Sequence, residues 1–105
     1  MVKFTSEAFS DIENFKKEVR KTLLNKIEEQ LKGSREDPEI TVIRRPSYDA
    51  EFPRLKITAN ELNHRIYFDY IDSELYLFAI RHREHAYTPE DIEQAVQRLK
   101  QLKKL

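Results

Sequence analysis

Apolar residues recur at every third or fourth position in the first third of the chain, which is the spacing of a helix that buries one face. Ser10 and Glu13 have the spacing of a capping box, which marks a start for this helix. Gly33 is a natural C-terminal stop because glycine adopts positive φ freely. The pattern predicts a helix over about residues 11–32, and further apolar positions upstream leave open a separate short helix that begins near Ser6. The apolar stripe consists of Ile12, Phe15, Val19, Leu23, Ile27 and Leu31.

Beyond this helix the pattern changes to the alternation of half-buried strands, separated by polar segments that contain prolines. Residues 54–59 alternate well, with Leu55 and Ile57 on one face and basic or hydroxyl side chains on the other. Residues 75–81 are apolar with little alternation, which is typical of a strand covered on both faces. The polar residues 72–74 predict a hairpin turn before this strand. The expected strands cover residues 2–4, 39–44, 54–59, 64–71 and 75–81.

The last element is predicted to be a helix. Thr88 is a suitable N-cap, Pro89 fits the first helical position, and Asp91 has capping-box spacing from the threonine. A helix, a run of antiparallel strands and a second helix make an α+β domain, and we expect a single domain over residues 1–105. The buried stripe of the last helix consists of Ile92, Ala95, Val96, Leu99 and Leu102.

Composition limits the functions that the chain can have. The 105 residues include 19 acidic and 19 basic side chains, so the net charge of zero argues against long-range capture of nucleic acid but permits a local basic face. The absence of cysteine excludes disulfides and thiolate metal sites, and a single glycine excludes glycine-rich phosphate loops. The chain has neither an apolar run long enough for a bilayer nor the plan of a signal peptide, so we expect a cytoplasmic protein.

The basic residues of the strand region fall on predicted strands or at their ends, whereas the acidic residues there fall mostly at loops and turns. If the strands pair in chain order, Arg54, Lys56, Arg65 and the strand end that carries Arg81 and Arg83 converge on one sheet face. Tyr67 then lies beside Arg65, and Tyr87 lies near the rim. Such a face suits RNA, whose phosphates bind cations and whose unstacked bases bind aromatic rings. The alternative is a solvated sheet face with ordinary salt bridges.

The segment after the apolar strand gathers residues that bind phosphate or move a proton, namely Arg81, His82, Arg83, His85 and Tyr87. It lies between a strand and a helix start, which brace it. Imidazole titrates near neutral pH, so His82 or His85 fits a general acid or base. No cysteine or well-spaced carboxylate completes a metal site with these histidines, so we expect no metal and no cofactor.

The stretch from about Leu55 to Leu102 resembles the C-terminal half of the RelE/ParE/HigB superfamily of bacterial and archaeal type II toxins. Residues 65–68, Arg-Ile-Tyr-Phe, resemble the family strand written Arg-(Val/Ile)-x-Tyr/Phe. The apolar residues 75–80 and the following His82-Arg83-x-x-x-Tyr87 resemble its apolar strand and His-Arg-x-x-x-Tyr segment. The last predicted helix is similar to the Thr-Pro…Glu-Ile…Ala…Arg helix of HigB-like members.

The resemblance implies a small twisted antiparallel sheet with helices against one face, here a long N-terminal helix and a C-terminal helix. RNase members cut mRNA, usually in the ribosomal A site, and leave a 2′,3′-cyclic phosphate. This reaction needs a base for the 2′-hydroxyl proton, cations for the phosphate and an acid for the leaving oxygen. On this basis the catalytic candidates are Arg65, His82, Arg83 and Tyr87, and the RNA-binding candidates are Arg54, Lys56, Arg81 and His85.

The first hypothesis is therefore the toxin of a type II toxin–antitoxin system that acts as an mRNA endoribonuclease, with mRNA, the ribosome and a cognate antitoxin as partners. The neutral charge motivates a second one, a non-catalytic interaction module of the same fold, either a ParE-like gyrase inhibitor or a degenerate relative. A third is an unrelated α+β domain that dimerises through its N-terminal apolar stripe. The sequence leaves the oligomeric state open.

Overall fold

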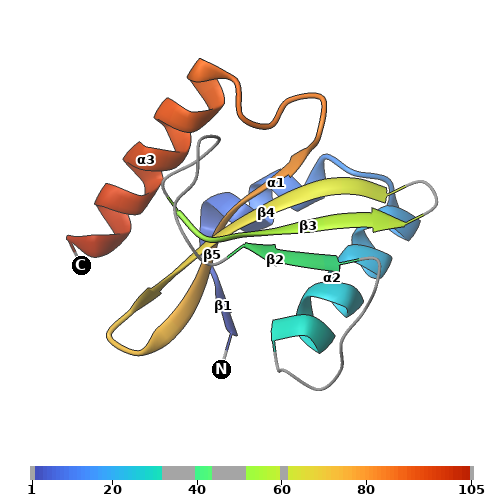
Figure 1. Cartoon of the computed structure of the whole chain (residues 1–105), viewed down its shortest axis with the longest axis horizontal. Helices are drawn as coiled ribbons and strands as arrows, with labels where there is room; N and C mark the ends of the chain where they lie inside the picture. Colours follow the sequence, from blue (N-terminus) through green and yellow to red (C-terminus); the bar gives the residue numbers. More distant parts are fainter. Residues whose placement is uncertain (1, 32–39, 44–51, 60–61, 105) are drawn as a thin grey trace.

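The computed structural model describes residues 2–31, 40–43, 52–59 and 62–104, which form the predicted α+β fold (Figure 1). The strands agree with the predicted ones to within two residues at each end. Part of the predicted loops, together with Gly33, lies outside the described residues. The elements in chain order are β1 (Val2–Phe4), α1 (Ser6–Glu13), α2 (Lys17–Leu31), β2 (Ile40–Ile43), β3 (Arg54–Ala59), β4 (Leu62–Ile71), β5 (Glu74–His82) and α3 (Pro89–Lys103).

The strands form one sheet in the order β1-β5-β4-β3-β2. From β2 to β5 all pairs are antiparallel, as predicted, but β1 pairs with β5 in parallel, with Phe4 opposite Leu77. The sheet is therefore mixed, and the expectation of a wholly antiparallel sheet is wrong at this edge. The pairing joins segments about seventy residues apart in the chain, so no turn fixes its direction and no local pattern reveals it.

The N-terminal helical region consists of two helices. The first begins at Ser6, so the alternative of a separate short helix is confirmed and the single helix over residues 11–32 is wrong. The first helix is capped by Thr5, whose Oγ1 accepts a hydrogen bond from the Ala8 amide at 3.1 Å, so Ser10 lies inside the helix and is not its cap. It ends at Asn14, whose side-chain amide donates to the Ser10 carbonyl at 3.2 Å. The apolar stripe runs on across the break, which is why periodicity alone did not show it.

The two faces of the sheet belong to different cores, because successive strand residues point to opposite sides. Leu55 and Ile66 pack with α1 and α2, whereas Tyr67 and Ala79 pack with α3. Helices therefore cover both faces, which corrects the expectation of helices against one face only. The core under α1 and α2 consists of Ile12, Leu23, Ile27, Leu55, Ile57, Leu62, Ile66, Phe68, Leu75, Leu77 and Ile80, and the core under α3 consists of Phe52, Tyr67, Phe78, Ala79 and Ala95.

A β-bulge and a tight turn shape the hairpin of β4 and β5. Asp72 and Ser73 both have positive φ, 52° and 68°, as a two-residue hairpin turn requires. Further along, Tyr67 pairs with Ala79 but its neighbour pairs with Leu77, so Phe78 is an extra residue in β5. The bulge directs Phe78 and Ala79 into the same core, under α3.

Truncation of the core beneath α1 and α2 tests this arrangement. Leu77 is fully buried, so Leu77→Ala is expected to lower the free energy of unfolding by about 2–5 kcal/mol through lost burial and a residual cavity. Lys100 is exposed on α3, so Lys100→Ala is expected to change the free energy of unfolding by no more than about 0.5 kcal/mol. Urea unfolding measures both, and equal effects would contradict the assignment of Leu77 to the core.

Candidate functional site

Three basic residues lie side by side across the sheet on the face covered by α3. Lys56 is paired with Arg65, and Arg65 is paired with Arg81, on adjacent strands. Arg54 lies two residues before Lys56 in β3 and therefore on the same face. The predicted convergence of these side chains on one face is confirmed. Directly opposed like charges destabilise a sheet unless other groups compensate them.

Two carboxylates compensate Arg81. Its Nε donates to Asp91 Oδ1 at 2.7 Å, and its other end lies 2.7 Å from Asp11 Oδ2. Burial alone would lower the pKa of Arg81, but the hydrogen bonds to Asp11 and Asp91 raise it above its usual value. The guanidinium also contacts Gln94 of α3. Because its donors are used inside the protein, this geometry gives Arg81 a structural role and lends no support to the prediction that it binds RNA.

Asp11 connects α1 to both β5 and α3. Arg98 binds its two carboxylate oxygens at 2.7 and 3.1 Å and also donates to the Phe78 carbonyl at 3.0 Å. The Ile80 amide donates to Asp11 Oδ2 at 3.0 Å. Burial raises the pKa of Asp11, but the hydrogen bonds from Arg98 and Arg81 lower it more, so the pKa lies below the usual range. The ionised carboxylate therefore ties three elements together.

Arg65 has no such compensation. Its side chain is buried, with 7% of the residue exposed, and one terminal nitrogen donates to Asn63 Oδ1 and to the His64 carbonyl, both at 3.1 Å. Its Nε has no hydrogen-bond partner, and no carboxylate among the described residues forms an ion pair with it. Burial lowers the pKa of Arg65; nearby Tyr87 opposes this shift, and the charge of Arg83 adds to it. A buried guanidinium is unfavourable where one of its donors has no partner, and this holds for the Nε of Arg65.

Tyr87 lies beside this charge. Arg54, of which 1% is exposed, donates from Nε to the Tyr87 hydroxyl oxygen at 3.0 Å. The guanidinium carbons of Arg54 and Arg83 lie 5.3 and 5.5 Å from the centre of the tyrosine ring, within the range of cation–π attraction. Arg83 itself is exposed. Arg54, Arg65, Arg83 and Tyr87 therefore form one constellation, which we call the arginine–tyrosine site.

The backbone of Tyr87 is held by the first turn of α3. Its φ of 67° lies in the left-handed region, where a residue with a Cβ is strained. The Tyr87 amide donates to Asp91 Oδ2 at 3.0 Å, and the same oxygen accepts from the Tyr67 hydroxyl at 2.5 Å. Thr88 caps α3 as predicted, its Oγ1 accepting from the Asp91 amide at 3.1 Å. Burial raises the pKa of Tyr67, and the bond to Asp91 raises it further, so Tyr67 stays a hydrogen-bond donor.

The histidines do not join this site. His64 and His82 are paired across β4 and β5 on the face of α1 and α2, with ring centres 5.1 Å apart. Phe15 packs edge-on against His64 at 4.9 Å. His82 therefore lies on the opposite face from Tyr87, so the structure does not bring these two candidates for proton transfer together. His85 is exposed, and within the described part of the chain its ring has no hydrogen-bond partner.

Burial and charge keep His64 neutral. Its Nδ1 accepts from the Asn63 amide at 3.2 Å, and the Nδ1 of His82 accepts from the Glu84 amide at 3.1 Å. Burial, then the charges of His82 and Arg65, lower the pKa of His64 to about 4. No group of three histidine, cysteine, aspartate or glutamate residues in the described ranges could hold a metal ion.

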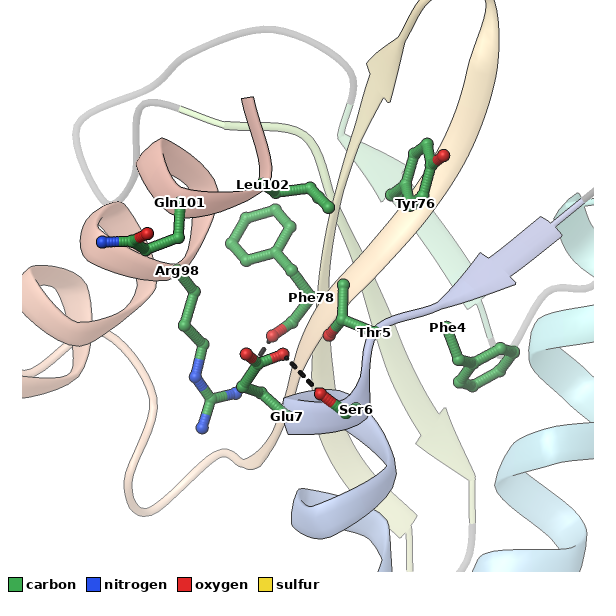
Figure 2. Close-up of a pocket in the computed structure, with 9 residues that line it drawn as sticks. All are labelled: Phe4, Thr5, Ser6, Glu7, Tyr76, Phe78, Arg98, Gln101 and Leu102. Carbon is green, nitrogen blue, oxygen red and sulfur yellow. Dashed lines mark hydrogen bonds between the residues drawn. The ribbon is translucent and has the colours of Figure 1, made fainter. Parts of the chain in front are cut away.

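A cavity of about 280 Å³ lies elsewhere, between the end of β1, the start of α1 and the second half of α3 (Figure 2). Phe78 and Leu102 supply apolar walls, and Ser6 and Glu7, joined by a hydrogen bond of 3.3 Å, border it from α1. Arg98 also lines it, but this arginine is engaged with Asp11. None of the residues of the arginine–tyrosine site lines the cavity.

Sequence reasoning missed the two carboxylates that organise this region. Asp91 was interpreted as part of a helix cap, and its bonds to Tyr67 and Arg81 come from tertiary packing. Asp11 lies beside an apolar stripe, and its partner Arg98 is 87 residues away. The alternation of β3 and β4 is the signal that places Arg54 and Arg65 on one face, and the contact of Arg54 with Tyr87 comes from tertiary packing.

The pH dependence of stability tests the state of His64. The unfolded chain binds more protons than the folded one between the folded pKa of about 4 and the ordinary 6.5, so stability is complete above 6.5 and falls as the pH drops towards 4. We expect a loss of about 2 kcal/mol between pH 7 and pH 4.5. His64→Phe should remove most of this loss in urea titrations, whereas His85→Phe should keep it. A loss unaffected by His64→Phe would rule out the neutral buried histidine.

The contrast between Arg65 and Arg81 gives a second test. Arg65→Met removes a buried charge without a carboxylate partner, so the free energy of unfolding is expected to stay unchanged or rise. Arg81→Met removes the ion-pair partner that Asp11 and Asp91 share. It is expected to lower the free energy of unfolding by about 3–5 kcal/mol. Denaturant titrations decide between them, and a large loss for Arg65→Met would show that an internal partner compensates it.

The comparison with known proteins agrees with this fold. The family described as "ParE toxin of type II toxin-antitoxin system, parDE" has a model that matches residues 2–87, more than half of the chain. No curated protein and no solved structure gives a significant match. Within the described residues no helix is long and apolar enough to cross a membrane. Membership implies a cognate antitoxin as partner. The chain belongs to the ParE toxin family of type II toxin–antitoxin systems.

Proposed function

We propose that this toxin is an endoribonuclease whose arginine–tyrosine site binds and cleaves a phosphodiester of mRNA. The observation that carries the proposal is the buried guanidinium of Arg65, which has an unpartnered Nε and no carboxylate partner among the described residues. Arg83 and Tyr87 lie near it, and Arg83 is exposed and therefore accessible to a substrate. Planar guanidinium groups suit phosphate, because their donors match two phosphate oxygens at once.

In the proposed reaction, the 2′-oxygen forms a bond to phosphorus while its proton passes to solvent. The bond from phosphorus to the 5′-oxygen breaks, and that oxygen takes the phenolic proton of Tyr87, which leaves a 2′,3′-cyclic phosphate and a 5′-hydroxyl. Tyr87 then regains a proton from solvent. Arg65 and Arg83 stabilise the charge that develops on the phosphate, and Arg54 orients the Tyr87 hydroxyl through the bond of 3.0 Å. Lys56, opposite Arg65 on the next strand, is placed for a neighbouring phosphate.

The neutral charge of the chain determines how RNA binding should depend on salt concentration and on distance. The basic groups of this small face can make about three phosphate contacts. A plot of the logarithm of the affinity for single-stranded RNA against the logarithm of salt concentration should then have a slope of about −2. Long-range attraction is weak in a neutral molecule, so recognition depends on local contacts. This is compatible with a substrate held near the toxin by another particle, such as mRNA on the ribosome.

A second candidate is inhibition of DNA gyrase, which the match to the ParE family favours. In this function the protein binds another protein, and Tyr87 moves no proton. The absence of an imidazole or carboxylate beside Tyr87 in the described part of the site is compatible with it, since Asp91 contacts the backbone amide of Tyr87 and His82 lies on the other face. Growth arrest alone does not separate the two candidates, so both activities need to be measured.

Substitution of Tyr87 and Arg83 tests the proposal. Tyr87→Phe keeps the ring but removes the proton donor, and the rate of RNA cleavage at saturating substrate is expected to fall by about 10²–10⁴-fold. Arg83→Ala is expected to weaken both binding and cleavage. The matched control Lys100→Ala removes an exposed positive charge of α3, outside the site, and should keep full activity.

The assay uses mRNA with and without ribosomes, and gyrase supercoiling is measured in parallel. Cleavage that requires Tyr87 supports the endoribonuclease. Inhibition of supercoiling by the wild-type protein and by Tyr87→Phe alike, without cleavage of RNA under either condition, would overturn it in favour of gyrase.

A further inference from the structure

We propose that Asp91 is a positioning residue that fixes Tyr87 for the reaction, an inference that rests on the proposed endoribonuclease. Its carboxylate accepts hydrogen bonds from the Tyr87 amide at 3.0 Å, from the Tyr67 hydroxyl at 2.5 Å and from Arg81 Nε at 2.7 Å. One side chain of α3 thus connects the backbone of Tyr87 to two strands of the sheet. Asp91 reaches neither the hydroxyl of Tyr87 nor Arg65 in these contacts, so it acts through Tyr87.

The need for such a contact comes from the conformation of Tyr87. A left-handed conformation is unfavourable by roughly 1–2 kcal/mol for a residue other than glycine, and it persists where the surroundings determine it. The φ of 67° falls in this region, and Tyr87 directly follows the turn after β5. The hydrogen bond of its amide to Asp91 stabilises this conformation at the backbone.

The sheet holds Tyr87 at two points. Tyr67 and Arg54 are paired across β3 and β4. Arg54 binds the hydroxyl of Tyr87, while Tyr67 binds the carboxylate that holds its amide and also lies within 3.3 Å of that amide. Both supports are buried, with 1% or less of either residue exposed. The buried centre of the sheet therefore determines the orientation of the Tyr87 ring. Asp91 connects the sheet to the backbone of Tyr87.

Asp91 belongs to the part of the chain that the family comparison does not cover. The match ends at Tyr87, and α3 begins at Pro89. Thr88 caps the start of α3, so that Asp91, four residues after Tyr87, lies in the first turn and reaches the Tyr87 amide. The third helix therefore contributes to the reaction, although none of its side chains contacts the substrate in the mechanism proposed above.

Asp11 offers a matched control for this role. It is a second buried carboxylate that binds Arg81, also at 2.7 Å, but its other partners are Arg98 and the Ile80 amide. Asp11→Ala and Asp91→Ala therefore each remove one carboxylate partner of Arg81. They differ in that only Asp91→Ala releases the backbone of Tyr87.

The experiment measures RNA cleavage by both variants, with kcat and KM scaled to the folded fraction. Asp91→Ala is expected to lower kcat by about 10–100-fold with KM within about twofold, because a shift of about 1 Å of a catalytic group has effects of this size. Asp11→Ala is expected to keep kcat within about threefold, although it loses at least as many hydrogen bonds. Should Asp91→Ala fail to fold, Tyr67→Phe removes one bond to Asp91 and is expected to lower kcat in the same direction.

A second readout follows the hydroxyl of Tyr87 without using activity. Exchange of the Arg54 Nε proton, observed by NMR, should be accelerated at least tenfold by Asp91→Ala and left near the wild-type rate by Asp11→Ala. Equal kcat values for the two aspartate variants, or equal exchange rates, would overturn the positioning role while the endoribonuclease stands. A wild-type protein that cleaves no RNA would overturn the proposed function itself, and the positioning inference with it.

Discussion

The charge balance on the α3 face of the sheet is the constraint on which the rest of the structure depends. Register places Lys56, Arg65 and Arg81 next to one another, and nearby cations repel in a medium from which water is excluded. The protein neutralises the last of them with Asp11 and Asp91, which reach it from helices at opposite ends of the chain. Arg65 is left buried without a carboxylate partner among the described residues, and the proposed function rests on this imbalance.

The same ion pairs connect the architecture to the site. Asp11 joins α1 to β5 and, through Arg98, to α3, so helices on both faces of the sheet are held to its second strand. Asp91 continues this network to Tyr87. Arg65 and Arg81 are thus neighbours on adjacent strands, and they differ in their partners: Arg81 has two carboxylates, whereas Arg65 has amide and carbonyl oxygens.

Local sequence signals predicted the parts of the molecule that depend on neighbours in the chain. The alternation of β3 placed Arg54 and Lys56 on the correct face, and Thr88 marked the start of α3 correctly. The signals failed where distant segments meet. The direction of β1, the role of Asp11 and the separation of His82 from Tyr87 all depend on tertiary contacts that leave no periodic trace. The apolar stripe continues through the break between α1 and α2, so the spacing of apolar residues left one helix or two open.

The central claim is that the buried guanidinium of Arg65 is an anion site, and NMR of its side chain tests this most directly. The Arg65 Nε resonance would be followed while a short RNA, methylated at every 2′-oxygen to prevent cleavage, is titrated into the full-length protein. We predict that this resonance shifts and saturates together with that of Arg83, with an affinity that falls as salt rises. RNA binding that leaves the Arg65 resonance in place, or no binding at low salt, would contradict the claim.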